Sequence, residues 1–290
     1  MSRVSVVRAG GDVPAAVRRS VELIDAPLPR GVDAVVKPNI CNAKNPDGMV
    51  ITDFRVIEAV VGLLKDRGCD VTVVESDNIS GTADVRAERS GLLALLDDLD
   101  VQWLNLSRDD YEEHEVAGTV LRMPRTVMEA EYLVNLPKMK TCAHTLVTLG
   151  IKNLYGVFQR KSKGRLHRHL DEILPYLAET VRNDLVVVDG LTCMEGNGPV
   201  VGNPVCLDLL VAGADIVSVD SLCSSLMGFD PAEIPHIASS FGRAPGEVDV
   251  ERIEVVGEDW TRLVHEFEPP YSLKATLKSL RAIKDIYLTR

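Results

Sequence analysis

Six polar side chains that could act on a ligand lie within one apolar stretch, LPKMKTCAHTLVTLGIKNLYG, at residues 136–156. Three are ammonium groups, two are hydrogen-bonding groups and one is an imidazole: Lys138, Lys140, Thr141, His144, Lys152 and Asn153. Ammonium groups bind carboxylates and phosphates, and an imidazole exchanges protons near neutral pH. A charged face turned to water would not be interleaved with so many apolar residues. We therefore expect a site that holds a small anion.

Polar residues also follow three segments that we expect to be buried strands. Lys37 and Asn39 follow DAVV, Glu75 ends DVTVVE, and Asp189 ends LVVVD. Parallel α/β sheets bind ligands outside the carboxyl ends of their strands, so these side chains should share a crevice with the lysines. Each residue could instead cap a helix or form a turn. Lys37 is the most informative, because a lysine leaving a strand buried on both faces needs an anion, a cleft or water.

These positions give a set of expected roles. We predict proton transfer by His144, Glu75 or Asp189, with the carboxylates neutralising the lysines before a ligand binds. The ligand itself is expected to contact Lys37, Asn39, Asp53, Lys138, Lys140, Thr141, Lys152, Asn153, Glu195 and Asn197. Two alternatives stay open. Lys138 and Lys140 share one face of an extended chain and could point to water, and His144 could be a purely structural hydrogen-bonding group.

The glycine-rich loop in MEGNGPVVGNP invites comparison with a dinucleotide-binding loop. Pro199 follows its second glycine, and the next segment, VCLDLLVAG, has the pattern of a strand. A dinucleotide pyrophosphate requires the N-terminus of a helix at that point. We therefore do not expect an NAD cofactor. We expect a loop that closes over a ligand, with Glu195 and Asn197 as polar contacts.

The cysteines argue against an iron–sulfur or zinc centre. They are scattered along the chain, at positions 41, 69, 142, 193, 206 and 223, and no CxxC or HExxH occurs. Cys142 is the one whose thiolate the nearby lysines would favour. Asp220, inside an apolar segment, has three open interpretations: an ion pair with a cleft lysine, ligation of a divalent metal together with Asp189, or a bond to the backbone. A divalent metal thus stays an option, and an organic cofactor is unknown.

Composition limits the class of protein. The 290 residues are 46% hydrophobic and 26% charged, as in a globular protein with a large core. The formal net charge of -11 argues against a nucleic-acid partner, because phosphate backbones bind basic faces. Neither a signal peptide nor an apolar run long enough to span a bilayer is apparent, so we expect no membrane partner and a cytoplasmic location. The oligomeric state is open, with a homodimer as one option.

Strand-like and helical segments alternate, which is typical of an α/β fold with a mainly parallel sheet and flanking helices. Expected strands are residues 3–7, 33–39, 70–76, 185–190, 205–213 and 251–259, with a hairpin at 114–123 and a strand that runs into a loop at 131–140. Expected helices are residues 53–68, 164–184, 214–228 and 231–242. A chain of this length forms either one large unit or two lobes around a cleft. We assign lobes to residues 1–130 and 131–290.

A series of motifs resembles the DUF362 family, in the same order and over roughly residues 30–240. They are VVKPNI, GMVITD, VVESDN, LPKMKTCAHT, GIKNLYG, VVDGLTCMEGNGPVVGNP and ADIVSVDSLCSSLMGFDP. The resemblance implies one DUF362-like unit, with an α/β core and a cleft. It also implies a link to redox chemistry, since many members carry ferredoxin-like cysteine clusters that hold [4Fe–4S] centres. This chain lacks those cysteines, so we expect no such cluster.

Two functions are compatible with these features. The first is an enzyme that acts on a small anionic metabolite, carrying a carboxylate or a phosphate, by proton-transfer or redox chemistry in a lysine-lined cleft. The second is a ligand-binding or carrier protein descended from a redox family, which uses the same cleft without chemistry. Carboxylates beside the cations favour the enzyme, because a simple anion binder gains nothing from negative charge in its pocket.

Overall fold

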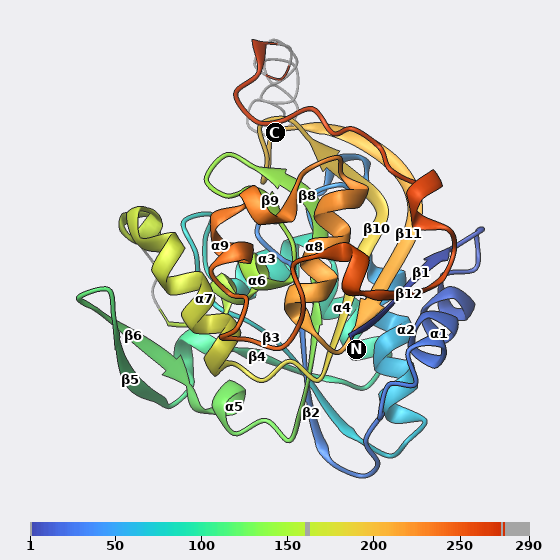
Figure 1. Ribbon diagram of the computed structural model, residues 1–290. Helices are drawn as coiled ribbons and strands as arrows, with labels where there is room; N and C mark the ends of the chain where they lie inside the picture. Colours follow the sequence, from blue (N-terminus) through green and yellow to red (C-terminus); the bar gives the residue numbers. More distant parts are fainter. Residues whose placement is uncertain (1, 160–162, 274, 276–290) are drawn as a thin grey trace.

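A large mixed sheet with helices on both faces forms the body of the molecule (Figure 1). The computed structural model describes residues 2–159, 163–273 and 275. Its strands are β1 (Arg3–Arg8), β2 (Asp33–Pro38), β3 (Asp70–Glu75), β4 (Gln102–Asn105), β5 (Tyr111–Val116), β6 (Thr119–Pro124), β7 (Tyr132–Leu136), β8 (Lys138–Cys142), β9 (Leu146–Thr148), β10 (Leu185–Glu195), β11 (Asn203–Gly213) and β12 (Glu254–Gly257). The expected α/β class with a mostly parallel sheet is confirmed.

Helices connect most of the parallel strands. The α-helices are α1 (Val13–Leu23), α2 (Phe54–Lys65), α3 (Ala83–Ser90), α4 (Leu92–Asp98), α5 (Arg125–Met128), α6 (Gly150–Asn153), α7 (Leu170–Thr180), α8 (Ile216–Leu226) and α9 (Pro235–Ala238). Short 3-10 turns lie at Pro46–Gly48, Leu106–Arg108, Leu154–Gly156, Lys163–His169, Pro231–Glu233, Val250–Arg252 and Trp260–Arg262. In the described part of the chain, none of these helices combines the length and the apolar character that a membrane span requires.

The strand order of the main sheet is β12-β1-β11-β10-β7-β2-β3-β4, with β8 paired to β10 and β9 paired to β8. Pairing is parallel along β10-β7-β2-β3-β4 and antiparallel where β11 meets β10 and β1. Strands from before and after residue 130 are hydrogen-bonded neighbours, since Ala34 of β2 pairs with Tyr132 of β7. The sheet is therefore continuous across the expected lobe boundary, and the division into two lobes stays a prediction.

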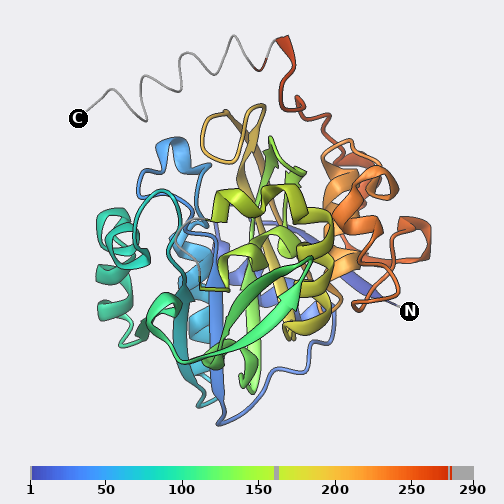
Figure 2. The same ribbon diagram turned by 90° about the vertical axis from the view of Figure 1, so that its left-hand side faces the viewer.

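Alternating burial places a separate apolar cluster on each face of the sheet. Val186 and Val188 of β10 pack into the cluster with α7, α8 and α9, whereas Leu185 and Val187 pack into the cluster with α1, α2 and α4. Successive strand residues point to opposite faces, so a strand that is apolar throughout must be covered on both. This is why LVVV has no polar alternation. The β5–β6 hairpin projects on the side of α7 (Figures 1 and 2).

One segment differs from its sequence-based assignment. Residues 138–140 were expected in a loop, but they belong to β8, which pairs with β10 and, in an antiparallel hairpin, with β9. Pro137 interrupts the extended chain without ending it, because proline tolerates extended backbone but donates no hydrogen bond. The result is that Lys138 and Lys140 are held on a strand and fully buried.

Candidate functional site

A pocket of about 340 Å³ lies beyond the ends of β2 and β3, against β8 and the turn that follows α6. Its polar and ionisable lining comprises Lys37, Asn39, Cys41, Glu75, Ser76, Asn78, Ser80, Lys140, Cys142, His144, Thr148, Lys152, Asn153, Tyr155, Lys163 and His167. The position agrees with the general rule that open α/β sheets bind ligands at the carboxyl ends of their strands.

Lys37 and Glu75 form an ion pair at the floor of the pocket. Lys37 Nζ lies 3.0 Å from Glu75 Oε2 and also donates to Pro38 O at 3.0 Å. Burial lowers the pKa of Lys37, although Glu75 opposes the shift. A charge-assisted bond to a neighbouring strand end satisfies this ammonium without a ligand. Lys37 therefore stabilises the floor of the pocket and adds to its electrostatic field, but its ammonium is not free to bind a ligand.

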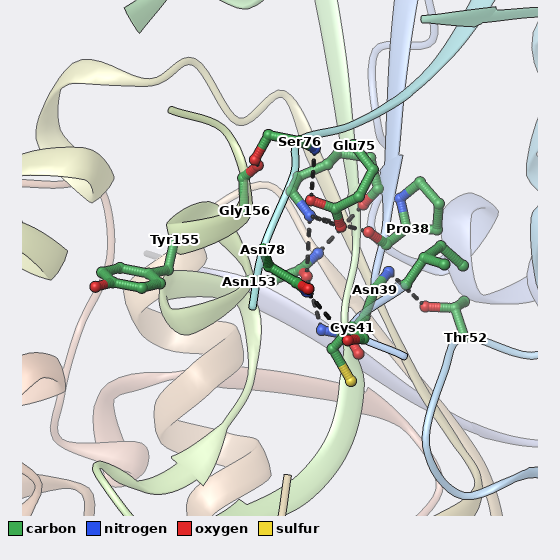
Figure 3. Close-up of polar contacts among 12 residues, drawn as sticks. Pro38, Asn39, Cys41, Thr52, Glu75, Ser76, Asn78, Asn153, Tyr155 and Gly156 are labelled. Carbon is green, nitrogen blue, oxygen red and sulfur yellow. Dashed lines mark hydrogen bonds and ion pairs between the residues drawn. The ribbon is translucent and has the colours of Figure 1, made fainter. Parts of the chain in front are cut away.

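Asn153 joins α6 to β2 through both ends of its amide. Its Oδ1 accepts hydrogen bonds from Lys37 Nζ at 3.2 Å and Asn39 Nδ2 at 3.0 Å, and its Nδ2 donates to Asn135 Oδ1 at 2.8 Å. Figure 3 shows Asn153, Asn39 and Glu75 gathered together, with the Tyr155 ring directed away from them. Because three elements depend on one amide, Asn153 fixes the floor of the pocket.

Asp220 of α8 holds the start of α6. Its carboxylate accepts the N–H groups of Gly150 at 2.7 Å and Ile151 at 2.8 Å, two donors that a helix N-terminus leaves without intrahelical partners. A Cβ at position 150 would lie 2.8 Å from Asp220 Oδ1, so the close approach requires glycine. Burial raises the pKa of Asp220 to about 7, although the two N–H groups oppose the shift. Of the three interpretations of Asp220, the structure shows the bond to the backbone.

Lys140 is satisfied by neutral acceptors. Its Nζ donates to Asn39 Oδ1 at 2.8 Å and Val50 O at 2.7 Å, and lies 3.2 Å from Cys41 Sγ. Within the described residues, Lys140 forms no ion pair with a carboxylate. The charge of Lys140 therefore still acts on the pocket that it lines.

Of the four lysines that line the pocket, Lys152 has the fewest partners within the described residues. Its half-buried side chain places Nζ 4.3 Å from the centre of the Tyr155 ring, and within the described residues no acceptor forms a hydrogen bond with it. Burial lowers the pKa of Lys152, and the charges of Lys140 and Lys37 lower it further, whereas Cys142 opposes the shift. An anion that entered the pocket would meet this ammonium ready to bind.

Lys163 is a pocket residue that the sequence analysis missed. Its Nζ donates to Ser76 Oγ at 2.6 Å and Tyr155 O at 3.0 Å, and it lies 4.5 Å from the centre of the Phe158 ring. Burial lowers its pKa to about 7, against the attraction of Glu75. The only signal in the sequence is a lysine before a glycine at the start of an expected helix, which is common on surfaces.

Two imidazoles stack beside the pocket. The ring centres of His144 and His167 are 4.0 Å apart, and the Tyr155 ring lies 5.8 Å from that of His167. Burial and the Lys152 charge lower the pKa of His144. Burial, His144 and Lys152 lower that of His167 to about 4. Both rings are therefore neutral at pH 7, and a neutral imidazole can accept a proton.

Three residues expected at the site lie outside the pocket lining. Lys138 Nζ pairs with Asp189 Oδ2 at 2.8 Å, with both side chains fully buried. The same oxygen accepts the Asp53 N–H at 2.7 Å, and Asp53 itself caps α2 by accepting the Arg55 N–H at 2.9 Å. These three residues connect β8, β10 and the start of α2, so their role in the structure is to stabilise the fold.

Three further expected residues hold the β10–β11 loop. Thr141 Oγ1 donates to Gly196 O at 2.7 Å. Glu195 Oε2 accepts the Glu268 N–H at 3.0 Å, and Asn197 Oδ1 accepts the Tyr271 N–H at 2.7 Å. The loop reaches the pocket through two other residues, Pro199 and Val200. The expected strand after the loop is confirmed as β11.

The pocket carries an excess of positive charge. Its described lining has four lysines, Lys37, Lys140, Lys152 and Lys163, and a single carboxylate, that of Glu75. Among the residues that the structure describes, no group of three or more His, Cys, Asp or Glu side chains is arranged to hold a metal ion. The geometry therefore suits a negatively charged ligand, with groups of shifted pKa at hand.

Two comparisons place the chain among known proteins. The family model described as "Domain of unknown function (DUF362)" matches residues 34–225. A curated relative, the thylakoid-associated protein sll1697 of Synechocystis sp., is 32% identical over 216 residues, which span 72% of this chain and 67% of the relative. The matched residues include the strands and the α6 region that carry most of the pocket.

Proposed function

The chain belongs to the DUF362 family, and we propose that its pocket binds a small anionic metabolite, with a carboxylate or a phosphate, and catalyses a proton transfer on it. The observation that carries the proposal is the Lys152 ammonium, half-buried in the pocket and without a hydrogen-bond acceptor in the described part of the chain. Keeping a cation in a partly desolvated site is unfavourable unless an anion neutralises it.

Binding would use the charges that the resting structure leaves uncompensated. Glu75 is engaged by Lys37, so it neutralises one of the four lysines. Lys140 donates to uncharged acceptors only, and Lys152 contacts a ring face. An anion beside Lys152 gains a charge-assisted hydrogen bond, which is about twice as strong as a neutral one, and the charge of Lys140 attracts the same anion.

Proton transfer would use groups whose pKa lies near or below neutrality. Lys163, with a pKa of about 7, can both give and take a proton at physiological pH. His144 is neutral and exposed at the pocket, so it can act as a base that exchanges its proton with water. The charge of Glu75 raises the pKa of Lys163, in opposition to burial. Redox chemistry on the same ligand would need a partner that supplies electrons.

The alternative is a carrier that binds the same anion without changing it. The recovered ligand decides between the two, because a carrier returns it unchanged after incubation and an enzyme converts it. A cytoplasmic location also belongs to this proposal. The relative is named for an association with thylakoids, so fractionation of cells into soluble and membrane pools would test the location directly.

The binding proposal is tested by calorimetric titration with two probes, inorganic phosphate and malonate. We expect one site in the wild-type protein, and a loss of about 2–4 kcal/mol of binding free energy in Lys152→Met, which keeps the stem and removes the charge. Lys65→Met is the matched control, because Lys65 is an exposed lysine at the end of α2, outside the pocket. Equal affinity in all three proteins would contradict the proposal. Separately, mass spectrometry of the small molecules released from the denatured wild-type protein would identify the natural ligand.

A further inference from the structure

Cys142 shares one face of the β8–β9 hairpin with two other polar residues of the pocket. Lys140 pairs directly with Thr148 across the hairpin, and Cys142 pairs with Leu146. Residues two apart on a strand, and residues opposite each other on paired strands, lie on the same face of a sheet. Cys142, Lys140 and Thr148 all line the pocket. The thiol is thus part of the pocket wall, although only 2% of Cys142 is exposed.

Thr148 independently indicates a ligand on this face. Its side-chain oxygen is buried and makes no hydrogen bond within the described structure, and the residue is only 4% exposed. Leaving a buried hydroxyl unpaired is unfavourable, so native structures nearly always satisfy one. A ligand oxygen in the pocket, in front of Lys140 and Cys142, would supply the missing partner.

The electrostatic surroundings favour the thiolate form of Cys142. Burial raises the pKa of a thiol, but the Lys152 charge and the nearby polar groups of Thr145 and the backbone outweigh burial and lower the pKa of Cys142. Burial raises the pKa of Cys193 and Cys223, which lie in the apolar core. A thiolate is the nucleophilic form of cysteine, so these three buried thiols are expected to differ in reactivity.

We propose that Cys142 is a nucleophile, and that the anionic ligand of this pocket carries an electrophilic carbonyl group. The proposal rests on the anion site proposed above. In the resting site Cys142 is a thiolate beside the Lys152 ammonium. The sulfur lone pair forms the S–C bond, while the π pair of the carbonyl moves to its oxygen. Lys152 gives a proton to that oxygen and becomes a neutral amine, so that a hemithioacetal forms with no other reactant consumed.

In this arrangement each polar group on the wall has a defined task. The charge of Lys140 attracts the carboxylate or phosphate of the ligand, and Lys152 neutralises first the thiolate and then the developing alkoxide. Thr148 donates a hydrogen bond to a ligand oxygen. The substrate class is therefore a small oxo acid or a phosphorylated aldehyde or ketone. The covalent step would hold such a substrate while a proton is moved on the adjacent carbon.

The test compares two alkylating reagents that differ in charge, iodoacetate and iodoacetamide, with peptide mapping by mass spectrometry to follow each cysteine. We expect iodoacetate to label Cys142 at least about tenfold faster than iodoacetamide, and labelling to persist below pH 7. The exposed Cys206 in the same protein is the internal control, with no preference for the charged reagent. Lys152→Met should abolish the preference, whereas Lys152→Arg and Lys65→Met should retain it.

A protection experiment tests the carbonyl itself. Glyoxylate and glycolate carry the same charge and similar size, but only glyoxylate has an electrophilic carbonyl. Glyoxylate should protect Cys142 from iodoacetate at concentrations at least about tenfold lower than glycolate. Equal protection by the two acids would show occupation of the anion site without addition of the thiol, and would overturn the proposal.

The remaining outcomes separate the two proposals. If Cys142 is labelled no faster than Cys206 while phosphate still binds, Cys142 is not a nucleophile and the anion site stands. If both reagents label Cys142 equally and phosphate neither binds nor protects, the anion site itself is wrong. Thermal melts of each variant confirm that a lost preference does not arise from unfolding.

Discussion

Replacing Lys138 and Lys152 by methionine, one at a time, should change stability in opposite directions. The two lysines belong to the same polar stretch, but their partners differ. Lys138 Nζ lies 2.8 Å from Asp189 Oδ2, with both side chains fully buried. Lys152 has a ring face as its neighbour and no carboxylate partner in the described chain. The first variant removes a partner, and the second removes a repulsion.

The expected magnitudes follow from these contacts. Removing one member of a buried ion pair costs about 3–5 kcal/mol, because the other charge is left uncompensated. Asp189 keeps the N–H groups of Asp53 and Leu191, at 2.7 Å and 3.0 Å, so we expect the lower end, about 3 kcal/mol. For a chain of this length, that is a fall in Tm of about 5 °C. Lys152→Met should raise stability by about 0–1 kcal/mol, since its charge is unfavourable in the folded state.

The assay is urea unfolding and thermal melting of the two variants and the wild type, without added anions. Lys65→Met again controls for the loss of one exposed charge outside the pocket, and any fall in its own Tm measures the loss of its hydrogen bonds to Leu99 O and Asp100 O. A fall of several degrees in Lys152→Met, together with an unchanged Lys138→Met, would refute the assignment of structural and binding roles. It would mean that Lys152 is the structural ion-pair partner and that the pocket has no free cation.

Three other outcomes are expected. Gly156→Ala should lower the free energy of unfolding by about 1–3 kcal/mol, since its Cβ would lie 2.6 Å from Glu75 Oε1 and 2.7 Å from Lys37 Nζ. The control is Gly62→Ala, which has open space around the added Cβ and should not destabilise the protein. Urea unfolding measures both variants. The stability of the wild-type protein should rise between pH 7 and 10.5, because Lys163 binds a proton in the unfolded chain but not in the folded one in that interval. Lys163→Met should lack this rise. Thermal melts over a pH series in which the two proteins run parallel would contradict the prediction. Protein purified anaerobically should contain no stoichiometric iron and sulfide, since its cysteines are scattered; a colorimetric assay checks it.

The floor of the pocket could be predicted because it obeys a general rule of sheets. Lys37, Asn39 and Glu75 end buried parallel strands, and the carboxyl ends of such strands meet at one edge. The apolar run before each residue identified the strand, so its polar end could be placed without knowledge of the pairing. Lys152 and Asn153 were placed by a similar argument, as polar groups leaving an apolar segment.

Other positions depended on partners that are distant in the sequence. KMKTC has the alternation of an edge segment with one face in water, but every residue of the segment is buried here. On its polar face Lys138 pairs with Asp189, and Lys140 lines the pocket. Glu195 and Asn197 contact residues about 70 positions away, and no local pattern encodes such a contact. Lys163 is recognisable only by its burial. Periodicity identifies which face of an element is polar, but not what covers it.

The positive pocket lies in a molecule whose formal net charge is -11, so two fields of opposite sign act on an approaching anion at different ranges. At an ionic strength of 0.15 M the Debye length is about 8 Å, which weakens the long-range repulsion but leaves contacts inside a partly desolvated pocket largely intact. Added salt should therefore raise the association rate of a small anion before it lowers the affinity. On the function that we propose, the net negative charge should slow the approach of a large polyanion more than that of a small anion, because a polyanion is repelled along its whole length.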